Sequence, residues 1–148
     1  MMNLSFAEKS TIGTLLATGA IGLMYLNSAW QLWQADQLDI KSMTGLAAGM
    51  TVLLVVVMIV YHALIALVSK PEHEDERDRL IAWRAGNIGG LVMGVGVIGV
   101  ILQILVGGMF GGVVAGSSVL IANALMAVVF IATVIELTVK LVFYRRGL

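Results

Sequence analysis

The sequence predicts an all-α, polytopic membrane protein with four transmembrane helices arranged as two hairpins and with both termini in the cytoplasm. Composition is the first observation: 59% of the 148 residues are hydrophobic and 12% are charged, whereas soluble domains carry roughly 25% charged residues. The mean hydropathy is +0.98. The second observation is four apolar runs, each long enough for the roughly 20 helical residues that cross a bilayer core. The third observation is the uneven distribution of Lys and Arg residues between the two sides of the membrane.

The apolar runs place the helices at about residues 10–33, 43–68, 72–106 and 113–143, which together form one domain over residues 1–148. The first run is longer than the roughly 7–15 apolar residues of a signal peptide. We therefore expect it to be retained as a spanning helix. It ends in Trp30 and Trp33, whose amphipathic rings favour the headgroup region.

The third helix is expected to begin near Pro71, because the missing N–H of proline is unpaired at a helix start in any case. The acidic residues that follow Pro71 favour the same position through the helix dipole. An uncharged turn over residues 107–112, rich in glycine, separates the third helix from the fourth.

The orientation follows from the excess of Lys and Arg in cytoplasmic connections. One side has only Lys41. The other side has Lys9, Lys70, Arg77, Arg79, Arg84, Lys140, Arg145 and Arg146. This asymmetry predicts that both termini and the central connection face the cytoplasm.

Glycines in the third helix indicate close helix packing. Gly86, Gly90 and Gly94 recur at four-residue spacing, and small residues let helix backbones approach one another in a membrane. We therefore expect the third helix at the centre of the bundle. The same glycines could serve packing within one chain or a homo-oligomer interface.

Several function classes are disfavoured. Formal net charge is zero, which gives no reason to expect nucleic-acid binding. The chain has no cysteine and two histidines, so a thiolate or multi-histidine metal site is not expected. We expect no metal, no cofactor and no enzymatic activity, because no catalytic motif stands out.

The central connection is the main candidate site for a lipid or protein partner. A solvated helix entry held by ion pairs such as Asp75 with Arg79 is the simpler interpretation. Docking of lipid headgroups or of a protein partner is the alternative. The candidate residues are Glu74, Asp75, Glu76, Arg77, Asp78, Arg79 and Arg84.

Four polar residues within the predicted spans form the second candidate set, because ionisable side chains in a membrane are often functional. They are His62, Gln103, Asn123 and Glu136. They could line a polar path, and His62 could bind a cofactor. Alternatively, they serve packing: Glu136 pairs with Lys140, and His62 forms a hydrogen bond between helices.

Three charged segments carry a resemblance. They are Glu8-Lys9-Ser10, Asp75-Glu76-Arg77-Asp78-Arg79-Leu80-Ile81 followed by Arg84-Ala85-Gly86, and Tyr144-Arg145-Arg146-Gly147. In them the chain resembles a family of small, uncharacterised four-helix proteins of the bacterial inner membrane. The resemblance covers the whole length, although the glycine content of the third helix departs from it. It implies four helices and a bacterial plasma membrane, and it implies no particular chemistry.

The sequence therefore favours a non-enzymatic accessory or regulatory membrane protein that contacts lipid headgroups or a protein partner through its cytoplasmic charged segment. A small transporter or channel-like oligomer is the first alternative. A cofactor-binding membrane subunit that uses His62 is the second.

Overall fold

The chain folds into four long α-helices. The computed structural model describes residues 5–68, 75–111 and 117–146. The helices are α1 (Phe6–Gln34), α2 (Ile40–Val68), α3 (Glu76–Phe110) and α4 (Ser118–Arg146). All four are long and apolar enough to cross a membrane, which makes this a multi-pass membrane protein by length and composition.

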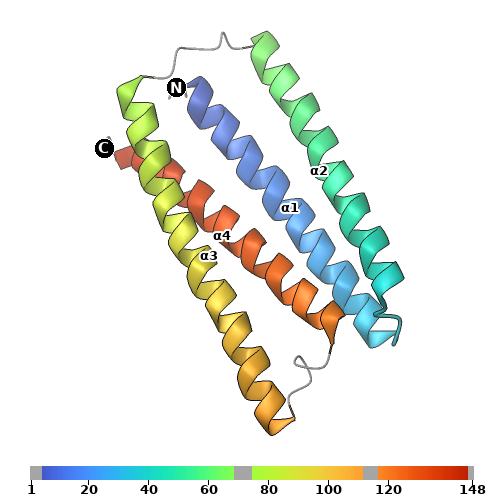
Figure 1. Ribbon diagram of the computed structural model, residues 1–148. Helices are drawn as coiled ribbons and strands as arrows, with labels where there is room; N and C mark the ends of the chain where they lie inside the picture. Colours follow the sequence, from blue (N-terminus) through green and yellow to red (C-terminus); the bar gives the residue numbers. More distant parts are fainter. Residues whose placement is uncertain (1–4, 69–74, 112–116, 147–148) are drawn as a thin grey trace.

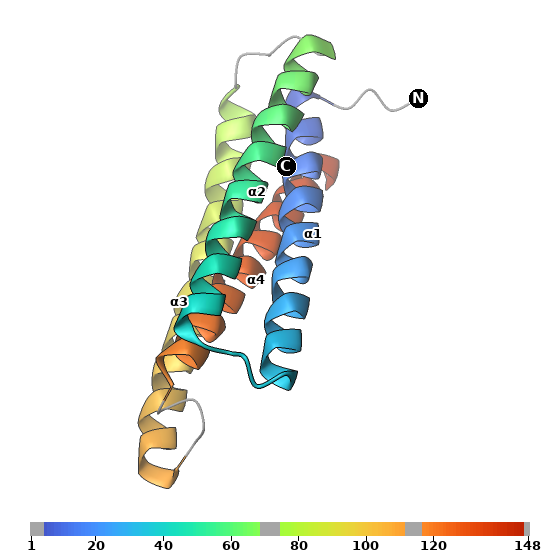
Figure 2. The same cartoon turned by 90° about the vertical axis from the view of Figure 1, so that its right-hand side faces the viewer.

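The helices lie in the spatial order α2, α1, α4, α3, and neighbours in this order run antiparallel (Figure 1). α1 packs against both α2 and α4, whereas α3 packs mainly against α4. The expectation that the third helix forms the centre of the bundle is therefore wrong: α1 and α4 are central, and α3 lies at an edge. α3 also extends past the other helices at one end (Figure 2).

Polar side chains define where the helices begin. Ser5 and Glu8 form a reciprocal capping box at the start of α1, with hydrogen bonds of 3.0 and 3.2 Å. Asp39 accepts a hydrogen bond from the Ser42 N–H at 2.7 Å at the start of α2. Such caps satisfy N–H groups that the first helical turn leaves unpaired.

α3 begins at Glu76, four residues later than expected, because Asp75 is its N-cap. The Asp75 backbone is extended, and its carboxylate accepts from the Asp78 N–H at 2.7 Å. Pro71 and Glu74 lie outside the described residues. The helix continues to Phe110 and ends at Gly111, whose φ of 77° suits a residue without a side chain.

The closest contacts of α3 glycines with α4 come from Gly89 and Gly96, which lie outside the four-residue series; within that series only a Cβ at Gly86 would meet α4, at 3.9 Å from Oε1 of Glu136. A Cβ at Gly89 would lie 2.8 Å from Cβ of Glu136, and one at Gly96 would lie 2.5 Å from a methyl group of Val128. A Cβ at Gly90 or Gly94 would meet no atom within 4 Å. The spacing of seven brings Gly89 and Gly96 to the same face after two helical turns, and that face packs on α4.

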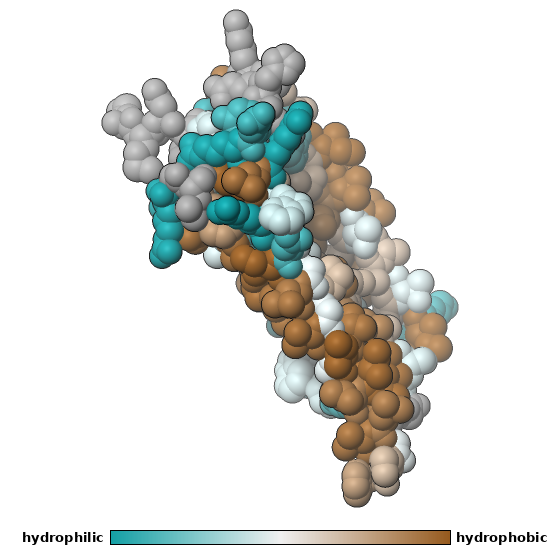
Figure 3. Space-filling model, turned by 60° about the vertical axis from the view of Figure 1, so that its left-hand side comes forward, coloured by the Kyte–Doolittle hydropathy of each residue, from teal (hydrophilic) through white to brown (hydrophobic). Residues whose placement is uncertain are grey.

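Most large apolar side chains point outward. α2 buries only Met43 and Ile65, and residues such as Leu67 and Val68 are exposed. The face seen in Figure 3 is apolar over most of its length and hydrophilic at one end. Outward apolar surface of this extent suits lipid rather than water.

Candidate functional site

One end of the molecule, which we call the charged end, collects most of the ionised side chains. α1 and α3 begin there, and α2 and α4 end there (Figure 1). Its described cations are Lys9, Arg77, Arg79, Arg84, Lys140, Arg145 and Arg146. Among described residues, the opposite end, which we call the far end, has Lys41 as its only Lys or Arg.

A cavity of about 250 Å³ opens at the charged end between three helices. We call it the charged-end pocket. It is lined by Phe6, Ala7, Ser10 and Thr11 of α1, Asp78 and Ala82 of α3, and Lys140 and Tyr144 of α4. The three helix ends therefore bring one carboxylate, one ammonium group and three hydroxyl groups to a single cavity.

The two charged groups of this pocket are half-buried. Asp78 differs in this respect from its neighbours Arg77 and Arg79, which are exposed. Asp78 and Lys140 line the same cavity, but no ion pair joins them, and neither side chain has a polar partner among the described residues. The pocket thus presents a negative and a positive group that remain available to a ligand.

The remaining candidates of the charged segment lie on the surface. Glu76, Arg79 and Arg84 are exposed. Arg77 donates a hydrogen bond of 3.4 Å to the carbonyl oxygen of Tyr144, which links the start of α3 to the end of α4. Asp75 caps α3 and forms no ion pair with Arg79, because its carboxylate faces the helix N-terminus.

His62 holds α2 against α1. Its Nδ1 lies 2.8 Å from the Met58 carbonyl oxygen and its Nε2 lies 3.0 Å from Ser10 Oγ. A carbonyl can only accept, so Nδ1 carries a hydrogen and donates it to Met58. The second hydrogen bond joins Nε2 and the Ser10 hydroxyl. Both ring nitrogens are therefore engaged in hydrogen bonds, and a cofactor could bind this histidine only by displacing one of them.

The neighbouring Tyr61 strengthens the same contact. Its hydroxyl donates to the Lys9 carbonyl oxygen at 2.6 Å. The ring occupies the space where a Cβ of Gly13 would lie. Gly13 is thus required for the close approach of α1 and α2 near the charged end.

Glu136 does not form the expected ion pair with Lys140. No interaction joins the two among the described residues. The Glu136 side chain points instead into the notch that Gly89 leaves on α3. Glycine at this position allows a half-buried carboxylate to lie between two packed helices.

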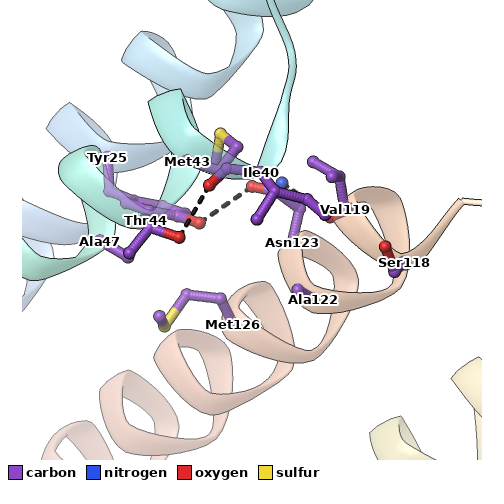
Figure 4. A pocket seen from close by; sticks show the side chains of 10 residues that line it. All are labelled: Tyr25, Ile40, Met43, Thr44, Ala47, Ser118, Val119, Ala122, Asn123 and Met126. Carbon is purple, nitrogen blue, oxygen red and sulfur yellow. Dashed lines mark hydrogen bonds between the residues drawn. The ribbon is translucent and has the colours of Figure 1, made fainter.

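A second cavity, which we call the far-end pocket, lies between α1, α2 and α4 (Figure 4) and has a volume of about 310 Å³. Its walls are mainly apolar. The Tyr25 hydroxyl donates to Asn123 Oδ1 at 2.9 Å, and Asn123 Nδ2 donates to the Val119 carbonyl oxygen at 3.0 Å. Asn123 therefore joins α1 to α4, and its amide is satisfied within the protein.

The four intramembrane polar candidates do not meet. His62 lies between α1 and α2, and Asn123 lies between α1 and α4. Glu136 faces α3, and Gln103 is exposed on α3. They occupy separate environments, and of the four only Asn123 lines any of the main cavities of the described part of the chain.

Comparison of the chain with protein-family models, with curated proteins and with solved structures gave no match. The fold defines a class, a membrane protein with four apolar helices. The function is therefore inferred from its own residues alone.

Sequence reasoning missed the charged-end pocket. The sequence indicates Asp78 only as part of a charged segment, and Lys140 only as a cytoplasmic cation and as a partner of Glu136. The spacing in α3 does give one signal: Asp78, Ile81 and Ala85 follow one another at three- and four-residue intervals, and the structure buries Ile81 and Ala85. Residues three apart share a helix face, so Asp78 belongs to the packed face of α3.

Proposed function

We propose that this chain is a non-enzymatic accessory or regulatory protein of a bacterial plasma membrane, with its charged end in the cytoplasm, and that this end binds anionic lipid headgroups. The observation that carries the proposal is the charge distribution. Seven described cations gather at the charged end, and five described acidic residues accompany them. Excess Lys and Arg mark the cytoplasmic side of membrane proteins.

Exposed arginines at this end are well placed for headgroups. Arg79 and Arg84 are exposed near the start of α3, beside the exposed ring of Trp83. Long cationic side chains keep their stems along apolar surface and their charged groups in the headgroup region. Each cation near an anionic leaflet contributes about 1 kcal/mol, so a cluster binds measurably where one residue does not.

Lipid recovery tests the proposal. The intact protein is extracted gently from its native membrane, and the anionic phospholipid bound per chain is measured by mass spectrometry. We expect severalfold less anionic lipid on an Arg79→Ala/Arg84→Ala variant, because two exposed cations are removed. Arg77 is kept in this variant, because its hydrogen bond to Tyr144 links α3 to α4.

The matched control is Lys41→Ala, which removes the far-end cation and should leave lipid recovery unchanged. Equal recovery of anionic lipid by the wild type and the double variant would contradict the proposal. Loss of a co-purified protein from the double variant, with lipid unchanged, would point to a protein partner instead.

A further inference from the structure

The charged-end pocket holds two opposite charges that do not neutralise one another. The Asp78 carboxylate comes from α3 and the Lys140 ammonium from α4, and both face the same cavity of about 250 Å³. Both side chains are half-buried. Partial burial of a charge costs free energy unless a partner compensates it, and neither charge has a polar partner among the described residues.

The pocket also keeps these groups accessible. No fully buried side-chain nitrogen or oxygen atom among the described residues lacks a hydrogen-bond partner. The charged atoms of Asp78 and Lys140 have no such partner, so they are not fully buried, and both residues line the cavity. A purely anionic ligand would approach Lys140 but would be repelled by Asp78. A purely cationic ligand would be attracted by Asp78 but repelled by Lys140. A ligand with both charges satisfies both groups.

The position of the pocket indicates where such a ligand comes from. The pocket is formed by the first two turns of α1 and α3 and the last turns of α4. Beside the charged groups, the lining includes the apolar side chains of Phe6, Ala7 and Ala82, and beyond the charged end the outward surface of the helices is apolar. Acyl chains could lie along this apolar surface while the headgroup enters the pocket.

We propose that the charged-end pocket binds the headgroup of a zwitterionic phospholipid that carries a primary ammonium group, of the phosphatidylethanolamine class. The phosphate lies at Lys140 and the ammonium at Asp78. A primary ammonium has three N–H donors and forms charge-assisted hydrogen bonds with a carboxylate. A trimethylammonium group has no N–H donor and cannot form them.

This inference rests on the proposed function in one respect: both place the charged end among lipid headgroups. It concerns different residues and a different class of lipid. Anionic lipid binding depends on the exposed Arg79 and Arg84. Selection of the ethanolamine headgroup depends on the half-buried Asp78 and Lys140. The two can therefore fail separately.

The test compares two lipids with identical acyl chains, dioleoylphosphatidylethanolamine and dioleoylphosphatidylcholine, added to the intact protein in detergent micelles. Native mass spectrometry counts the bound lipid. We expect the wild type to bind the ethanolamine lipid about tenfold more tightly, the lower end of what a hydrogen bond to a charged group contributes. Asp78→Asn should reduce this preference to near equality, whereas Lys140→Met should weaken the binding of both lipids.

The matched control is Asp36→Asn, which makes the same change of side chain at an exposed carboxylate of the far end and should leave the preference intact. Equal binding of the two lipids by the wild type, or an unchanged preference in Asp78→Asn, would overturn the proposal. Displacement of the bound lipid by an equal concentration of water-soluble glycerophosphoethanolamine would overturn the assignment to a lipid.

Discussion

Single polar residues determine where the helices begin and how they touch. Ser5, Asp39 and Asp75 each accept a hydrogen bond from a backbone N–H in the first turn of the helix that follows. His62 and Tyr61 then connect α2 to α1 by hydrogen bonds to Ser10 and to the Lys9 carbonyl oxygen. In a membrane, hydrogen bonds of this kind contribute about 1 kcal/mol each, and they fix the register of neighbouring helices.

The Asp39 cap gives a pH dependence outside the membrane spans. Hydrogen bonding from the Ser42 N–H lowers the pKa of the Asp39 carboxyl below its ordinary value. The stabilisation is therefore fully present above that ordinary pKa and is lost as the pH falls through the lowered value of the folded protein. We expect the wild type to lose stability relative to Asp39→Asn below about pH 4.

Thermal unfolding in detergent between pH 7 and pH 2.5 checks this expectation. Asn caps a helix as well as Asp does but does not titrate, so it is the matched control. Parallel stability curves for the two proteins over this range would contradict the role of Asp39.

The sequence does not show which way a side chain points, and this limits what it predicts for single residues. The charged segment was recognised, but composition alone cannot show that Asp78 turns inward while Arg79 stays exposed. Glu136 and Lys140 are four residues apart, which favours an ion pair in an exposed helix. The notch at Gly89 offers the Glu136 side chain another position, and that notch depends on the neighbouring helix.

The face of α3 that packs against its neighbour depends on where the glycines lie around the helix axis more than on how many glycines the helix has. The existence of four helices was predictable, because long apolar runs carry a strong signal. Their spatial order was not, because Gly86, Gly90 and Gly94 indicated one face of α3 and the packed face contains Gly89 and Gly96. Hydropathy does not distinguish a face that meets lipid from one that meets another helix, since both are apolar.

Adjacent glycines of α3 provide a direct test. Gly89→Leu should place its side chain against Glu136 and lower the free energy of unfolding by about 1–3 kcal/mol, as overpacking does. Gly90→Leu should leave the monomer almost unchanged, because no neighbour lies within 4 Å of its Cβ position. Thermal unfolding in detergent measures both variants.

Size-exclusion chromatography with light scattering measures the oligomeric state of the same two variants. If Gly90→Leu converts an oligomer to a monomer, the Gly90 face is an interface between copies of the chain. Equal destabilisation of the monomer by Gly89→Leu and Gly90→Leu would contradict the α3–α4 packing described above.

The whole molecule combines an apolar middle with a strongly asymmetric pair of ends. Each of the four apolar helices is long enough to cross a bilayer core. All the described cations except Lys41 gather at one end, where α1, α3 and α4 also line the charged-end pocket. Both proposed binding events place this end among the lipid headgroups of the cytoplasmic leaflet.

The orientation of the charged end is tested most directly by cysteine labelling, because the chain has no native cysteine. Gln37→Cys places one thiol between α1 and α2 at the far end, and Arg79→Cys places one at the charged end. With a membrane-impermeant maleimide on sealed right-side-out vesicles, we predict that Gln37→Cys is labelled at once and that Arg79→Cys is labelled only after the membrane is permeabilised. Labelling of Arg79→Cys in the sealed vesicles, with Gln37→Cys protected, would contradict the account.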